Sequence, residues 1–130
     1  MPSVHIVIGL ALLQFFYFGL EVAKARGRYK VEAPATSGNE IFERYFRVQM
    51  NTLELLVMFI PAILIFGLYI NPYVAAGIGA VYLLGRMIYL SSYVKDPKSR
   101  SAGFGLSALP TMILLCGGIY GAARAAFFAH

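Results

Sequence analysis

The chain has 130 residues, of which 59% are hydrophobic and only 13% are charged. About a quarter of the residues in a soluble domain are charged, so this composition excludes an ordinary soluble enzyme. It predicts an integral membrane protein with a single domain, residues 1–130. The formal net charge of +5 is carried by basic residues that border apolar segments. We therefore interpret them as topology signals and anion ligands, and expect no nucleic-acid partner.

Four apolar segments are long enough to cross a membrane. The sequence predicts membrane spans over residues 3–23, 48–70, 72–93 and 101–128. The helix that contains the second span is expected to start near Asn39, and the third follows the turn at Asn71 and Pro72. The glycines of "GGIYG" in the last span would let helix backbones approach closely. The predicted fold class is an all-α membrane protein, a bundle of four transmembrane helices.

The basic residues are distributed unequally between the two ends of these spans. The connections at residues 24–47 and 95–100 contain nine of the eleven Lys and Arg residues. Four spans put both termini on one side, so the positive-inside rule predicts both connections in the cytoplasm and both termini outside. No Lys or Arg precedes the first apolar segment, which argues against a cleaved secretory signal. In a bacterium this topology corresponds to the inner membrane, the location we expect, and in a eukaryote to the endoplasmic reticulum or another internal membrane.

A polar stretch, "FERYFRVQMNTLE" at residues 42–54, leads into the second apolar segment. At 100° per residue, four of its side chains share one helix face: Glu43, Arg47, Asn51 and Glu54. Gln49 points to nearly the opposite face. A charged group inside a bilayer costs about 2.5–3.5 kcal/mol even on the permissive insertion scale. Such a stripe must face other helices, water or a ligand.

The third span contains a second polar stripe. Its members follow +4, +3 and +4 spacing and therefore share a face: Tyr82, Arg86, Tyr89 and Tyr93. Helix rise places Arg86 about 13 Å inside the cytoplasmic end, and Arg100 follows this span in "VKDPKSR". Both stripes lie at the same membrane depth, which leaves two interpretations open. They form either an interhelical network that only holds the bundle together, or a cytoplasm-facing site for an anionic polar molecule.

Other reactive residues give weaker signals. His5 and His130 are isolated near the two ends of the chain, so we expect no metal site. The sequence has no carboxylate pair, Gly-rich phosphate loop or nucleophile–base set. The single Cys116 lies in an apolar run, where a buried and unreactive thiol is expected.

The combined motifs resemble those of the MAPEG superfamily, the membrane-associated proteins in eicosanoid and glutathione metabolism. These motifs are "FERYFRVQMNTLE", then "YLLGRMIYLSSY", then an arginine seven residues after the last tyrosine. The similarity covers nearly the whole chain and is greatest to the microsomal glutathione transferases and leukotriene C synthase, in a short bacterial form. It implies a left-handed four-helix bundle assembled as a homotrimer. It also implies glutathione bound between neighbouring subunits near the cytoplasmic surface.

Carried over to this sequence, the resemblance assigns eight residues to glutathione. The contacts expected within one subunit are Arg47, Asn51, Glu54, Tyr89 and Tyr93. Arg26 and Gln49 match contacts that the adjacent subunit supplies. Arg100 matches the arginine that faces the glutathione sulfur and stabilises its thiolate, so it is the expected catalytic residue. Leu55 and Gly27 replace a tyrosine and an arginine of leukotriene C synthase, which favours a more general transferase or peroxidase.

The resemblance and the residue chemistry together predict a membrane glutathione transferase with glutathione as co-substrate. Arginines suit the two carboxylates of glutathione, and Glu54 suits its ammonium. The thiolate would attack a hydrophobic electrophile dissolved in membrane lipid, or reduce a lipid hydroperoxide. Two alternatives stay open, a non-catalytic lipid-binding or scaffold protein and an isomerase that uses glutathione as a cofactor. Arg100 favours the enzyme, since a scaffold needs no group that stabilises a thiolate.

Overall fold

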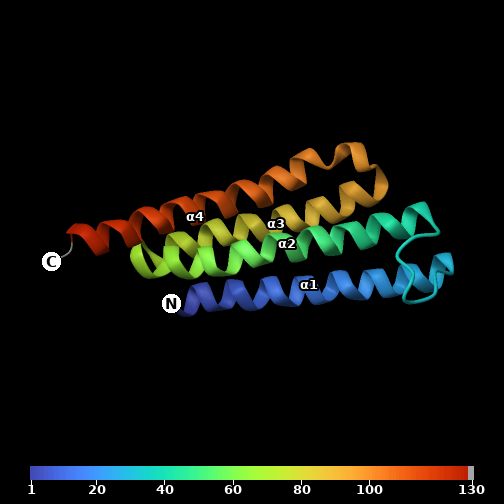
Figure 1. Ribbon diagram of the computed structural model, residues 1–130, viewed down its shortest axis with the longest axis horizontal. Coiled ribbons are helices and arrows are strands. Elements are labelled where there is room, and N and C mark those ends of the chain that lie inside the picture. Colours follow the sequence, from blue (N-terminus) through green and yellow to red (C-terminus); the bar gives the residue numbers. More distant parts are fainter. Residues whose placement is uncertain (129–130) are drawn as a thin grey trace.

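The computed structural model describes residues 1–128, which form four long α-helices joined by short connections. The helices are α1 (Pro2–Tyr29), α2 (Glu40–Tyr69), α3 (Pro72–Lys95) and α4 (Ser101–Phe128), with a short 3-10 helix, η1 (Pro97–Ser99), before α4. Figure 1 shows the four helices side by side, with both termini at one end. The α1–α2 and α3–α4 connections lie at the other end. His130 lies outside the described residues.

Asparagine side chains set the starts of α2 and α3. The side-chain oxygen of Asn39 accepts hydrogen bonds from two backbone N–H groups in the first turn of α2, at 2.9 and 3.0 Å. Asn71 does the same for α3, at 2.8 and 3.1 Å, and Pro72 opens that helix. These contacts satisfy donors that a first helical turn leaves free. The helix starts expected at these two asparagines are confirmed.

The helices α2 and α3 form the centre of the bundle, and each packs against α1 and α4. Buried apolar side chains come from all four helices, among them Val4, Phe59, Ala75 and Leu114. The ring of Phe59 in α2 stacks on Tyr82 of α3, with 3.9 Å between the ring centroids. In lipid such close packing, more than exclusion from water, holds helices together.

Two glycines bring α3 and α4 into backbone contact near the end of the bundle where these two helices connect. A Cβ on Gly85 would lie 2.5 Å from the carbonyl carbon of Leu106, and a Cβ on Gly103 would lie 2.5 Å from Tyr89 Cα. Because these neighbours are backbone atoms, no side-chain rotation could relieve either contact. The two glycines therefore set the distance between α3 and α4.

The outer surface of the bundle is strongly apolar. Large hydrophobic side chains are exposed on every helix, including Leu13 (65%), Val57 (68%), Leu84 (58%) and Leu109 (63%). Each of the four helices is long and apolar enough to cross a membrane, so this surface is suited to lipid or to other subunits. Cys116 is also exposed. The expectation of a buried thiol was wrong, because Cys116 lies on a face of α4 that points away from the bundle core.

Candidate functional site

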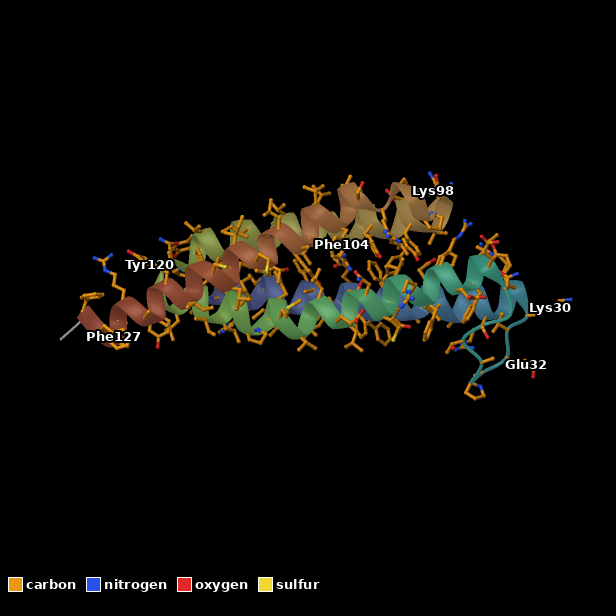
Figure 2. All side chains as sticks on the ribbon, turned by 45° about the horizontal axis from the view of Figure 1, so that its top comes forward. Lys30, Glu32, Lys98, Phe104, Tyr120 and Phe127 are labelled. Carbon is orange, nitrogen blue, oxygen red and sulfur yellow. The ribbon has the colours of Figure 1, made fainter. Side chains whose placement is uncertain are left out.

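A cavity of about 570 Å³ opens between α2, the end of α3 and the start of α4. Six of its lining residues are candidate site residues from the sequence: Arg47, Asn51, Glu54, Tyr89, Tyr93 and Arg100. In Figure 2, Phe104 marks the α4 wall of this cavity, and Lys98 marks the nearby end of the bundle. The structure thus brings together residues from three segments that lie far apart in the sequence.

The α2 wall of the cavity carries charges of both signs. Arg47, Asn51 and Glu54 lie at positions i, i+4 and i+7, so one helix face presents all three. Arg47 and Glu54 are exposed, and within residues 1–128 neither side chain forms an ion pair with another residue. Both are therefore free to bind a charged ligand. Glu43, predicted on the same face, lies outside the cavity and accepts a hydrogen bond from Gly38 N at 3.4 Å.

The opposite wall is aromatic. The rings of Tyr89 and Tyr93 stack with 5.4 Å between their centroids. Phe104, in the second turn of α4, packs tilted against Tyr89 at 6.3 Å. Arg100 lies at the start of α4, exposed and without an ion-pair partner among the described residues. The cavity therefore combines two arginines, one carboxylate, one amide and two tyrosines.

Below the cavity lies a buried polar network centred on Arg86, which is 0% exposed. Its guanidinium donates to Asn51 Oδ1 at 2.8 Å, to Thr52 Oγ1 at 3.1 Å and to Ser107 Oγ at 2.7 Å. The α3 stripe thus divides into two parts. Tyr82 and Arg86 belong to the interior of the bundle, whereas Tyr89 and Tyr93 face the cavity. The first part of the stripe therefore belongs to an interhelical network, whereas a ligand site at Tyr89 and Tyr93 stays a prediction.

The MAPEG family model matches residues 4–128 of the chain. The chain belongs to the MAPEG family. Microsomal glutathione S-transferase 2 of Homo sapiens is 43% identical over 98 residues, which cover 75% of this chain and 67% of that protein. Leukotriene C4 synthase of Rattus norvegicus is 35% identical over 127 residues, covering 92% of this chain and 85% of that protein. Uncharacterized protein sll1147 of Synechocystis sp. is 43% identical over 114 residues, 88% of this chain and 83% of that protein.

Family membership confirms the resemblance seen in the sequence motifs. Together with the four long apolar helices, it identifies the chain as a multi-pass integral membrane protein. The expected all-α fold with four such helices is confirmed. In this MAPEG chain, residues 1–128 contain no group of three or more His, Cys, Asp or Glu side chains that could hold a metal ion.

Two candidate residues, Arg26 and Gln49, lie outside the cavity of their own chain. Arg26 donates to the carbonyl oxygens of Val31 at 3.4 Å and Ala35 at 2.7 Å, both in the α1–α2 connection. Its guanidinium also lies 4.9 Å from the centroid of the Phe42 ring. Gln49 lines a separate groove on the outer face of α1 and α2, with Leu12, Phe15, Phe16, Gly19 and Leu20.

The structure also adds residues that sequence reasoning missed. Ser101, Phe104 and Gly105 line the cavity, and their spacing after Arg100 was the available signal, since one helix face carries positions i, i+1, i+4 and i+5. Arg44 donates to the carbonyl oxygens of Val94 at 2.9 Å and Lys95 at 3.3 Å. It thereby ties α2 to the last turn of α3, next to the connection that carries Arg100.

Proposed function

We propose that this MAPEG protein is a membrane glutathione transferase that binds glutathione in the cavity between α2, α3 and α4. The observation that carries this proposal is that Arg47, Glu54 and Arg100 converge on one cavity and have no ion-pair partner within residues 1–128. Its volume of about 570 Å³ lies within the range of ligand pockets, roughly 300–1,000 Å³. The names of two relatives, a microsomal glutathione S-transferase and a leukotriene C4 synthase, support the same conclusion.

The charges of the cavity complement those of glutathione. The tripeptide carries two carboxylates and one ammonium. Guanidinium groups bind carboxylates through forked, charge-assisted hydrogen bonds, a role that suits Arg47. Glu54 is the acidic lining residue and can pair with the ammonium. Tyr89 and Tyr93 offer hydroxyl groups and ring faces along the peptide part.

Arg100 is the proposed catalytic residue. A free thiol with a pKa of about 8.5 is only a few per cent thiolate at pH 7. Lowering that pKa by about two units requires roughly 2.7 kcal/mol of selective anion stabilisation, which a guanidinium at the sulfur can supply. The thiol proton leaves to solvent. The thiolate electron pair then forms a C–S bond to the electrophilic carbon, while the bond from that carbon to its leaving group breaks.

The second substrate is a hydrophobic electrophile that reaches the sulfur from the lipid phase. We infer that the protein works as a homotrimer in which Arg26 and Gln49 complete the cavity of a neighbouring subunit. Their positions outside their own cavity and the apolar outer surface support this assembly. The basic connections lie at the cavity end of the bundle. We therefore place that end in the cytoplasm, and the protein in a bacterial inner membrane.

Glutathione binding and conjugation test the proposal directly. Protein purified in mild detergent is titrated with glutathione in a calorimeter, and thiolate formation is followed by its far-ultraviolet absorbance. Conjugation of chlorodinitrobenzene, a hydrophobic aryl halide, measures turnover. We expect saturable binding and turnover. We also expect the thiolate absorbance to appear at pH values below the thiol pKa of free glutathione. Binding without a thiolate signal or turnover would instead favour the non-catalytic alternative.

A further inference from the structure

The buried guanidinium of Arg86 has no acidic partner in the part of the chain that the structure describes. The ion pairs within residues 1–128 join Lys24 to Glu21 and Arg44 to Glu40. Arg86 is 0% exposed, and its three hydrogen-bond acceptors are neutral oxygens. A buried charge without a counter-charge is costly, so an anion bound close to Arg86 would be stabilised by it.

The hydrogen bonds of this network have fixed directions. The hydroxyl of Thr52 donates to Val48 O at 2.7 Å, and that of Ser107 donates to Gly103 O at 2.9 Å. Each hydroxyl therefore offers only its lone pairs to Arg86. A guanidinium has donors and no acceptor, so Asn51 must turn its Oδ1 toward Arg86. This leaves the Nδ2 amino group of Asn51 for the cavity that the same side chain lines.

We propose that Arg86 is a positioning residue that holds Asn51 as a hydrogen-bond donor toward the cavity. The inference rests on the proposed function and adds which part of glutathione lies against Asn51. A donor backed by an unneutralised positive charge selects a carboxylate and rejects the ammonium. The bound carboxylate then supplies the negative charge that Arg86 does not find among residues 1–128.

Arg86 also supports the cavity through a second lining residue. Its guanidinium carbon lies 4.4 Å from the centroid of the Tyr89 ring. Two of its contacts, Asn51 and Tyr89, line the cavity, whereas Thr52 and Ser107 do not. Substitutions at the two kinds of contact can therefore distinguish an effect of Arg86 on the ligand from an effect on helix packing.

A double-mutant cycle measured by glutathione titration of the full-length protein in detergent tests this inference. The variants are Arg86→Met, Asn51→Ala and their combination. Arg86→Met keeps a long apolar side chain and should weaken binding about tenfold, the usual size of a lost charge-assisted hydrogen bond. In the Asn51→Ala background the same change should have a much smaller effect, because only the contact of Arg86 with Tyr89 is then lost from the cavity wall. Equal weakening in both backgrounds would overturn the inference.

Two further variants keep Arg86 in place. Ser107→Ala removes a hydrogen bond to Arg86 that has a similar length but is more deeply buried and lies away from the cavity. It should lower the thermal midpoint and leave the affinity for glutathione unchanged. If it weakens binding as much as Arg86→Met does, the role of Arg86 is general packing and the inference fails.

Asn51→Asp decides the matter if Arg86→Met does not fold. The new carboxylate pairs with Arg86, so the thermal midpoint should hold or rise, while the affinity for glutathione falls below that of Asn51→Ala. If the Asn51→Asp protein binds glutathione as tightly as the wild type, Asn51 does not act as a donor to the ligand and the inference fails. Absence of glutathione binding by the wild type would overturn the proposed function itself, whereas tight wild-type binding with additive effects overturns only this inference.

Discussion

The two ends of the bundle contain cavities of similar size but different chemistry. At the end that bears the termini, two neighbouring cavities of about 470 and 480 Å³ are lined by aromatic and apolar side chains around Arg124. A single arginine among tyrosines and phenylalanines is typical of an anchor at the membrane surface. At the other end, arginines, a carboxylate and an amide from three segments meet in one cavity. Cavity size therefore does not distinguish the two ends, but the convergence of polar side chains of both charges from three segments does.

Of the substitutions at the two ends of the bundle, Arg100→Ala should have the largest effect on activity. Losing about two pKa units of thiolate stabilisation would cut turnover at neutral pH by one to two orders of magnitude. Glutathione affinity should fall less, because the carboxylate contacts bind thiol and thiolate alike. The lost rate should partly return as pH rises toward the pKa of the free thiol, near 8.5. The measurement is kcat and KM across pH in the chlorodinitrobenzene assay.

Arg124→Ala is the matched control at the opposite end, and it should leave both kinetic constants unchanged. Arg100→Lys should restore only part of the rate, since a point charge cannot reproduce the planar fork. If Arg100→Ala keeps the wild-type rate and pH profile, another group activates the sulfur.

The next largest effect is expected from a substitution where α3 and α4 approach each other closely. A methyl group on Gly103 would meet the Tyr89 backbone at 2.5 Å, so Gly103→Ala should push the two helices apart. Overpacking of this kind costs about 1–3 kcal/mol, which should lower the thermal midpoint and reduce turnover together. Gly77→Ala serves as the control, since a Cβ on Gly77 meets nothing within 4 Å. Equal behaviour of the two variants would show that the separation of the helices is not set at Gly103.

The charged residues of α2 should affect binding more than turnover. Glu54→Ala removes the proposed partner of the ammonium and should weaken glutathione binding about tenfold, as expected for a charge-assisted hydrogen bond. Glu43→Ala removes a carboxylate from the same helix face, but one that lies outside the cavity. Calorimetric titration of both variants tests whether position in the cavity matters. If they weaken binding equally, the effect is long-range charge and Glu54 has no specific contact.

The sequence predicted the helices because their signals are local. Apolar length gives the spans, and Asn39 and Asn71 supply helix starts that can be recognised without tertiary structure. The two polar stripes were also readable, since helical periodicity alone places their members on one face. Six of the residues expected to bind glutathione do line one cavity, although their roles remain predictions.

The remaining features depend on how the helices are rotated and spaced in three dimensions. Periodicity could not tell that Arg86 points into the bundle while Tyr89, on the same stripe, borders the cavity. It also could not predict that Arg44 donates to carbonyl oxygens of another helix, those of Val94 and Lys95. Cys116 was misplaced for the same reason, because an apolar run does not reveal which of its faces is turned outward.

The smallest expected effect comes from Gln49, whose proposed role is in the cavity of a neighbouring subunit. Its side chain lies in the groove beside Gly19 of α1 and does not line its own cavity, whereas Arg47 does. Loss of one neutral hydrogen bond should lower affinity about fivefold in Gln49→Ala. Arg47→Ala should weaken binding more, since it loses a charged contact. Both are measured by glutathione titration of trimers whose mass is checked by native mass spectrometry.

Coexpression of these two variants then tests the trimer itself. In a mixed trimer, some cavities receive Arg47 from a Gln49→Ala chain and Gln49 from an Arg47→Ala neighbour. Such a cavity contains both native side chains, so a class of sites with wild-type affinity should reappear although neither variant has it alone. A mixture of separately purified trimers is the control and should show no such class, because their subunits stay unmixed. If coexpression also yields only weak sites, both residues act within one chain, and the inter-subunit role of Gln49 is wrong.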